Sequence, residues 1–305
     1  MSAPNPEPPP QNLLLGIGIS LIAYMFFVSV SSIVWTFRAQ FPTAQILFMQ
    51  NVISLICILP IALRFGVKKL KTPCFSTHLM RDFFGVGSYF LYFLAIRNLN
   101  LVDATTLNYT APFFVPLIWW AWMKQSVGLH VWWSILAGFL GVAIILDPSH
   151  HIFQTGFVFG LCAGIASAVS FCALRILNLN KEPMSRTLFY YFSCGTLFLL
   201  PFAWALWVPP TPLQWIKTIW VGVGTAIAQV LLTVAYRFGT ASYLSPLGYT
   251  TVIYAALVSW LLFDQPLTLR SLLGTAIIIV GGTVTYILKK RPESVAETFK
   301  NPDAK

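Results

Sequence analysis

The residues best suited to binding chemistry lie in one stretch, "NYTAPFFVPLIWWAWMKQ", at residues 108–125. Two aromatic residues and two prolines follow one another there at helical spacings: Tyr109, Pro112, Pro116 and Trp120. A helix would carry all four on one face. Prolines interrupt backbone hydrogen bonds, which a membrane-embedded helix tolerates only beside other protein or a wet cavity. The pattern predicts a kinked, aromatic face that lines a binding cavity. The alternative is that the rings only pack between helices or anchor the chain at the membrane interface.

Polar side chains inside long apolar runs form the second group of candidates. An unpaired polar group is costly in hydrocarbon and normally turns toward the protein interior. The candidates of this kind for substrate binding are Gln50, Asn108, Ser170, Gln229 and Tyr236. For each polar group, the alternative is an interhelical hydrogen bond worth about 1 kcal/mol. Tyr89 adds a ring that could stack on a planar or cationic ligand.

Groups for catalysis or metal binding are not evident from the sequence. None of the nine acidic residues lies centrally in a predicted helix, so a buried carboxylate that carries a proton is not predicted. Asp82 and Asp103 are interpreted as boundary charges and helix caps. The alternative is that they are drawn inward, with Arg81 and Arg97 as partners. The four histidines and five cysteines show no spacing typical of a metal site or a disulfide framework. We therefore predict no enzyme activity, catalytic residue, metal or cofactor.

The composition indicates that lipid, and not water, surrounds most of the segments that carry these residues. Hydrophobic residues make up 57% of the chain and charged residues 9%. Continuous apolar runs of about 18 or more residues recur along the chain, which is typical of an all-α polytopic membrane protein and not of a barrel. We predict ten transmembrane helices, at residues 13–36, 43–63, 82–97, 103–123, 129–147, 155–177, 187–207, 215–236, 241–263 and 270–288. Residues 1–12 and 289–305 are predicted to be disordered tails.

The net charge of +10 predicts an orientation in the membrane and not a nucleic-acid partner. If both termini are cytoplasmic, most of the 19 lysines and arginines fall in cytoplasmic loops and tails. The exceptions are Arg38, Arg97, Lys217 and Arg270. This bias independently supports an even number of helices. It also predicts a multi-pass protein of the cytoplasmic (inner) membrane.

The sequence contains an internal repeat. Residues 95–145 align without a gap with residues 235–285, which lie 140 positions further along. The matched pairs include Tyr109 with Tyr249, Thr110 with Thr250, and Trp120 with Trp260. Two apolar segments aligned by chance would share leucines, but they would not readily share these pairs in one register. Tyr249 therefore joins the candidates for substrate binding. The fourth helix is expected to bend more than its counterpart, because the counterpart lacks both prolines.

The repeat predicts two five-helix halves, at residues 13–147 and 155–288. An odd number of helices in each half makes the second half lie inverted in the membrane. Inverted repeats are typical of transporters that bind substrate near the midplane, between the halves.

Small residues recur every four positions in the predicted sixth helix, at Gly156, Gly160, Gly164 and Ala168. A strip of this kind lets another helix approach closely. We interpret it as a packing surface, which in a transporter could also slide.

The order and duplication of these motifs resemble the EamA-type branch of the drug/metabolite transporter superfamily. Each repeat of that family has an apolar helix that often contains proline, a turn written roughly "gE", and a helix with glycines seven residues apart. Here "AIRNLNLVDATTLNYTAPFFVPLIWWAWMKQ" and "AYRFGTASYLSPLGYTTVIYAALVSWLLFDQP" fill the first part, and Gly274 and Gly281 supply the spaced glycines. Two departures concern charge. The usual Glu of the turn is Gln125 and Gln265, and an Arg common early in the second helix is Gln50.

The resemblance implies a ten-helix secondary transporter that works by alternating access. The cargo implied is a small polar organic metabolite, such as an amino acid, a nucleoside-like compound or S-adenosylmethionine. The expected partners are this substrate and membrane lipid, and a homodimer is compatible with the sequence. The alternatives are an intramembrane lipid-modifying enzyme, a channel and a structural membrane subunit. The sequence contains no nucleotide-hydrolysing motif, so the expected energy source is the substrate gradient or exchange.

Overall fold

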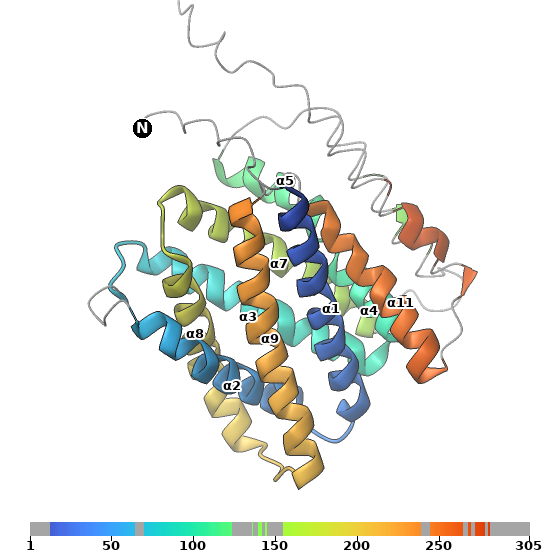
Figure 1. The fold of residues 1–305 in the computed structure, drawn as a ribbon. Coiled ribbons are helices and arrows are strands. Elements are labelled where there is room, and N and C mark those ends of the chain that lie inside the picture. The colour runs from blue at the N-terminus through green and yellow to red at the C-terminus, as the bar shows by residue number, and fades with distance from the viewer. Residues whose placement is uncertain are drawn as a thin grey trace, which may run out of the picture.

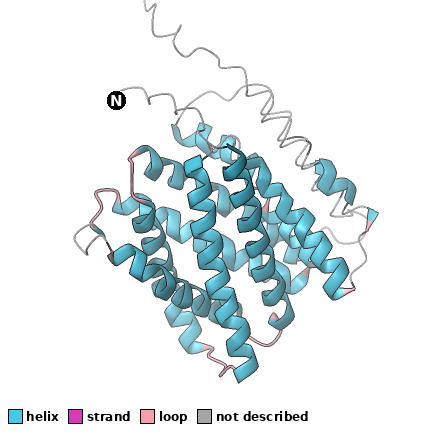
Figure 2. Cartoon of the chain, in the orientation of Figure 1, coloured by secondary structure: helices cyan, strands magenta, loops and turns pink. Residues whose placement is uncertain are grey.

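A computed structural model describes residues 13–64, 70–123, 155–238 and 245–264, short pieces at 268–269 and 272–277, and single helical positions at 136, 140, 141, 144 and 280. These parts are helical and contain no strand (Figure 2). The helices predicted at 129–147 and 270–288 lie largely outside the described residues, and both tails lie outside them entirely. The number of ten helices therefore stays a prediction.

The described helices follow the apolar runs of the sequence (Figure 1). They are α1 (Leu13–Phe37), α2 (Thr43–Leu63), α3 (Phe75–Asn98), α4 (Leu101–Asn108), α5 (Ala111–Met123), α7 (Thr155–Leu179), α8 (Met184–Ala205), α9 (Pro212–Phe238), the 3-10 helix η2 (Ser245–Tyr249) and α11 (Thr250–Phe263). Within the described parts, α1, α2, α3, α7, α8 and α9 are long and apolar enough to cross a membrane. The predicted all-helical membrane class is thus confirmed for these residues.

The third helix is longer than predicted. It was expected to begin at residue 82, but α3 begins at Phe75. His78, Arg81 and Asp82 lower the hydropathy of its first two turns, which is why the apolar run begins later in the sequence than the helix does. All three side chains are buried, so the helix carries them into the protein and does not stop before them.

The helix predicted over residues 103–123 is two helices, α4 and α5, which are separated at Tyr109 and Thr110. Pro112 has no N–H to donate to the carbonyl of Asn108, and a proline is well tolerated in the first turn of a helix such as α5. The kink predicted from the prolines is therefore a complete interruption. As a result, Tyr109 and Trp120 do not lie on one continuous helix.

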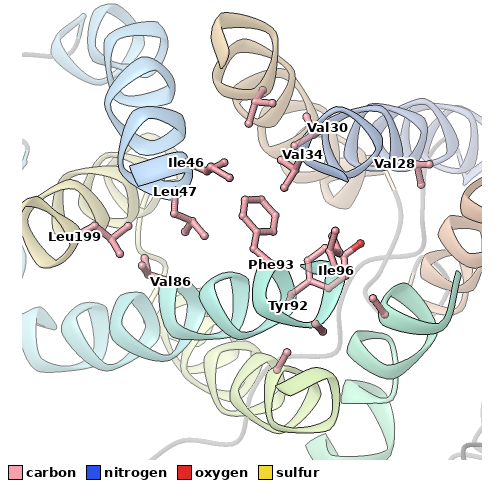
Figure 3. Packing of buried hydrophobic residues seen from close by; sticks show 14 of the residues in the cluster. Val28, Val30, Val34, Ile46, Leu47, Val86, Tyr92, Phe93, Ile96 and Leu199 are labelled. Atoms are coloured by element: carbon pink, nitrogen blue, oxygen red, sulfur yellow. The ribbon is translucent and has the colours of Figure 1, made fainter. Parts of the chain in front are cut away.

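Helices from residues 13–123 pack mainly against helices from residues 155–263. α3 lies along α7, α1 lies along α9, and α2 packs against α8 and α9. Figure 1 shows α1 and α9 side by side. The fully buried ring of Phe93 on α3 lies among Val34 of α1 and Ile46 and Leu47 of α2 (Figure 3). The same buried cluster includes Phe192 and Leu199 of α8 and Val221 of α9, so the two parts of the chain share one core.

The strip of small residues on α7 is a packing surface, as predicted. A Cβ atom added at Gly160 would lie 2.7 Å from Leu107 Cδ1. One added at Gly164 would lie 2.5 Å from Thr110 Oγ1 and 2.9 Å from the carbonyl oxygen of Leu107. No side chain fits at these separations without movement of the neighbouring backbone. The strip thus holds α7 against α4 and against the break that follows α4.

Glu182, in the connection between α7 and α8, joins the two parts of the chain outside the helices. Its carboxylate accepts hydrogen bonds from Thr72 Oγ1 at 2.7 Å and from Arg186 Nη1 at 2.7 Å. The Nε2 atom of His78 lies 3.5 Å from Glu182 Oε2. Burial by itself raises the pKa of Glu182, but the hydrogen bonds from Thr72 and Arg186 outweigh it and lower the pKa below its ordinary value. The ionised carboxylate is therefore the form that the fold stabilises.

We expect Gly164→Ala to lower the melting temperature of the purified protein in detergent, because the added methyl group would meet the backbone of the α4 end. Gly87→Ala is the matched control, since nothing lies within 4 Å of its added Cβ. Alanine is more favourable than glycine in a helix by about 1 kcal/mol, so the control should melt at the same temperature or higher. An unchanged melting temperature for Gly164→Ala would contradict the packing role.

Acid should remove the contribution of Glu182. Because its pKa is lower in the folded protein than the ordinary value of about 4.3, ionised Glu182 adds stability above that value, and this stability is lost as the pH falls through the folded pKa. We expect Glu182→Gln to melt below the wild type at neutral pH, and its melting temperature to fall less on acidification. Asp264→Asn, at an exposed carboxylate with a left-handed backbone (φ 49°) that asparagine tolerates, is the control. Equal acid sensitivity of Glu182→Gln and the wild type would rule out this role for Glu182.

Candidate functional site

The chain leaves α-helical geometry at the same place in both repeats. α4 ends at Asn108 before Thr110, and 140 residues further on the 3-10 helix η2 ends just before Thr250. The hydroxyl of Thr110 donates to the carbonyl of Leu107, and the hydroxyl of Thr250 donates to the carbonyl of Leu247, both at 2.6 Å. In the second repeat, the described chain is a 3-10 helix up to Tyr249, with Pro246 inside it, and becomes α-helical at Thr250; this change of helix type is the second break. The Leu-x-x-Thr hydrogen bond is the feature that both breaks share.

The two breaks lie against each other. α4 contacts α11, and a Cβ atom added at Gly248 of η2 would lie 3.3 Å from Tyr109 Cε1 and 3.6 Å from the hydroxyl of Tyr24. The ring of Tyr109 therefore packs on the backbone of η2, which glycine leaves open. Tyr249 follows directly and is buried, and its hydroxyl has no hydrogen-bond partner in the described part of the chain. The structure thus brings the predicted residues Tyr109 and Tyr249 into one region.

Asn108 is joined to α3 and α7 by a line of polar groups. Ser167 of α7 donates to Asn108 Oδ1 at 3.3 Å. The Ser167 hydroxyl also pairs with Ser88 of α3, and Ser88 is 2.9 Å from the carbonyl of Ala163. The amide of Asn108 therefore lies where α3, α4 and α7 meet. It retains an NH₂ group that can donate further hydrogen bonds.

Tyr89 lies near the side chains of Tyr92, Tyr109 and Tyr191. It is partly accessible, whereas Tyr92 is buried and bonds Thr105 at 2.9 Å. The structure thus brings the predicted residues Tyr89 and Tyr109 near each other.

A buried ion pair on α3 agrees with the alternative interpretation of the sequence and not with the preferred one. Arg81 Nη1 lies 3.1 Å from Asp82 Oδ1, and the two side chains are 7% and 0% exposed. The Arg81 guanidinium lies 4.1 Å from the centre of the Tyr191 ring. Ser170, a predicted site residue, donates to the carbonyl of Arg81 at 2.8 Å. The interpretation of Asp82 as a boundary charge is therefore wrong, and the alternative with Arg81 as partner is correct. The adjacent opposite charges of "RD" were the available signal, because such a pair can enter a helix bundle together.

Asp103, by contrast, is a cap residue as predicted. Its backbone N–H donates to the side chain of Asn100, the N-cap of α4, at 2.7 Å. Asn100 Nδ2 donates back to the Asp103 carboxylate at 2.7 Å. Arg97 donates to the carbonyl of Phe41 at 2.8 Å.

The remaining predicted residues lie apart from this group or are not described. Gln50 is buried on α2, and its Oε1 has no partner in the described part of the chain. Gln229 is half-buried on α9. Trp120 is 49% exposed and its repeat counterpart Trp260 is 57% exposed, which favours the alternative of an interfacial anchor. The side chain of Tyr236 lies outside the described residues.

The grouped residues offer aromatic faces, an amide and hydroxyl groups. Such groups suit reversible binding of a polar molecule that has a planar or apolar part. Among the described residues, no three His, Cys, Asp or Glu side chains are placed to hold a metal ion.

A solved structure shares the fold of this chain. That crystal structure is 17% identical in sequence, has a TM-score of 0.65, and covers 92% of this chain and 99% of its own. The similarity extends over nearly the whole of both chains.

Relatives with named activities are transporters. A pseudopaline exporter of Pseudomonas aeruginosa is 26% identical and covers 87% of this chain and 93% of its own length. A riboflavin transporter of Vibrio cholerae is 28% identical and covers 85% and 89%. An S-adenosylmethionine uptake transporter of Rickettsia bellii is 25% identical and covers 81% and 84%.

The family comparison covers both repeats. The model of the EamA-like transporter family matches this chain twice, over residues 14–147 and over residues 154–287. The resemblance read from the order of the motifs is confirmed. The chain belongs to the EamA-like transporter family.

Proposed function

We propose that this protein is a secondary transporter of a small polar organic molecule that carries an aromatic or other planar part. The observation that carries the proposal is the meeting of one non-α-helical stretch from each repeat, the break after α4 at Tyr109 and the 3-10 helix η2 at Gly248. Interrupted helices at the repeat interface are where transporters of this general kind place their substrate sites.

Within this proposal, the substrate contacts the partly accessible ring of Tyr89, the ring of Tyr109 and the amide of Asn108. The rings stack on a planar group, and the amide bonds a polar one. Tyr249 lies beside them and contributes its hydroxyl. Gln50, Gln229 and Ser170 border the same helices, and a direct contact with substrate is proposed for none of them.

Transport would proceed by alternating access in the cytoplasmic membrane, with ten helices, inverted halves and both termini in the cytoplasm. The extensive contacts of α3 with α7 and of α1 with α9, which join the two parts of the chain, support movement of packed surfaces past one another. The close contact between the α7 strip and α4 would act as one of these surfaces. A substrate that binds at the breaks would then favour one arrangement over the other through the contacts it makes there.

Named transporters among the relatives support transport over an intramembrane enzyme or a structural subunit. The names of these relatives also suggest the first compounds to test. Riboflavin and S-adenosylmethionine both combine polar groups with a planar ring system, and so do nucleosides and aromatic amino acids.

We expect at least one of these compounds to raise the melting temperature of the purified protein in a saturable way, because a ligand that binds the folded state stabilises it by mass action. Tyr109→Ala and Asn108→Ala should each weaken that binding about tenfold, which corresponds to about 1.4 kcal/mol. The measurement is a ligand-dependent thermal shift, followed by counterflow of the labelled compound in liposomes.

Trp204→Ala is the matched control, since this aromatic side chain is 82% exposed on α8 and should not alter binding. Full affinity in both Tyr109→Ala and Asn108→Ala, with protein that melts normally, would place the substrate elsewhere. The absence of a thermal shift with every compound, together with no counterflow, would reject this cargo class.

A further inference from the structure

The Arg81–Asp82 pair lies where three helices from both parts of the chain meet. Both residues are on α3, Ser170 of α7 bonds the Arg81 backbone, and Tyr191 of α8 lies under the guanidinium. The thiol of Cys194, also on α8, lies beside the Asp82 carboxylate. The pair therefore belongs to the contact between the two parts, and it is not a surface ion pair.

The pair is incompletely satisfied for its degree of burial. The one N–H···O contact of 3.1 Å is longer than the range of about 2.7–2.9 Å for charge-assisted hydrogen bonds. Neighbouring residues on a helix do not face each other, so a bidentate geometry is not formed. Asp82 Oδ2 and Arg81 Nε have no hydrogen-bond partner in the part of the chain that the structure describes. A buried charge with unmet bonding capacity is costly and contributes little to stability, which favours a functional role.

Opposing influences act on the Asp82 carboxyl group. The apolar surroundings favour its uncharged form, and the guanidinium of Arg81 favours its charged form. The other titratable and charged groups around it are His78 on α3, Tyr191 and Cys194 on α8, and Glu182 with Arg186 at the start of α8. Ser170 is the contact from α7, and α2 has no charged residue. Arg81 is therefore the cation in direct contact with Asp82 among the described residues.

We propose that Asp82 is a proton-exchanging carboxylate that couples transport to a proton gradient, with Arg81 as its counter-ion. This inference rests on the proposed transport function. Asp82 Oδ2 accepts a proton from water on one side of the membrane and forms an O–H bond. That bond breaks when the proton leaves to water on the other side, while Arg81 keeps its charge throughout.

Protonation changes the contact between the two parts of the chain. When Asp82 is neutral, Arg81 loses its ionic partner, and its interaction with Tyr191 and with any anionic group of the substrate becomes more favourable. The charge on Asp82 therefore changes how α3 is held against α8. Such a change at one contact can shift the balance between two arrangements of the helices.

The first experiment does not require a known substrate. The carbonyl stretching band of a protonated carboxylic acid is recorded by infrared spectroscopy for the protein in phosphatidylcholine liposomes, between about pH 5 and about pH 9, the range that buried carboxyl groups can reach. We expect a titrating band in the wild type that is absent in Asp82→Asn and present in the control Asp264→Asn. Cys194→Ala keeps the ion pair and should shift the pH midpoint of the band. If no titrating band is lost in Asp82→Asn, Asp82 does not exchange a proton and the proposal is overturned.

The second experiment uses radiolabelled S-adenosylmethionine and riboflavin as probes in the same liposomes. We expect an imposed pH gradient to change uptake by the wild type about tenfold or more, roughly the effect of a 1.4 kcal/mol driving force. Asp82→Asn should lose this response and keep counterflow, since exchange of substrate needs no net proton movement. Counterflow by the wild type without a response to the gradient would overturn the coupling and leave the transport function standing. If neither probe moves, the proposed cargo class fails, and the infrared result alone decides whether Asp82 exchanges a proton.

Discussion

Backbone that leaves helical geometry inside a bilayer has to be covered by other protein, because lipid cannot satisfy its polar groups. The break between α4 and α5 is covered by the glycine strip of α7. At Gly164, the backbone of α7 approaches both the Leu107 carbonyl and the Thr110 hydroxyl so closely that a Cβ atom has no room. The hydroxyl of Thr110 satisfies the same carbonyl. The position of Tyr109, and hence the geometry of the candidate site, depends on this contact.

The shared core follows from the same packing. The most extensive helix contacts join residues 13–123 to residues 155–263, so both parts contribute apolar side chains to one buried cluster. The buried cluster illustrates this, because it contains Phe93 of α3 together with Leu199 of α8 and Val221 of α9 (Figure 3). A movement between the two parts must therefore keep most of these surfaces in contact. Small side chains such as those on α7 make such movement less costly than interlocking large ones.

Sequence reasoning reached the class, the family and most of the helix positions because long apolar runs and a duplicated motif are strong signals. It misplaced the start of α3, because His78, Arg81 and Asp82 lowered the hydropathy of turns that are nevertheless buried. A hydropathy scale scores residues one at a time, so it does not register that two neighbouring charges neutralise each other.

The break at residue 109 was predicted as a kink from its prolines. The 3-10 turn before Thr250 was not predicted, because the positions that match Pro112 and Pro116 in the second repeat are not prolines, and Pro246 lies earlier, within η2. There the relevant signal was a threonine hydroxyl that bonds a carbonyl three residues earlier, and such bonds compete with helix geometry. Asn108, Tyr89 and Tyr109 were proposed as binding residues from their side-chain types and their positions in apolar runs. Their proximity depends on which helices pack together, and the residue pattern of a single sequence does not reveal that arrangement.

The adjacency of Arg81 and Asp82 has a consequence for biosynthesis. The chain is made from its N-terminus, so α3 enters the membrane before the ribosome has produced α7 and α8. A charged residue whose counter-ion lay on a later helix would remain unpaired in lipid until that helix was synthesised and inserted. Two oppositely charged neighbours on one helix neutralise each other from the moment that the helix is inserted. The single long contact between Arg81 and Asp82 therefore agrees with a need to neutralise both charges during synthesis, before α7 and α8 are present.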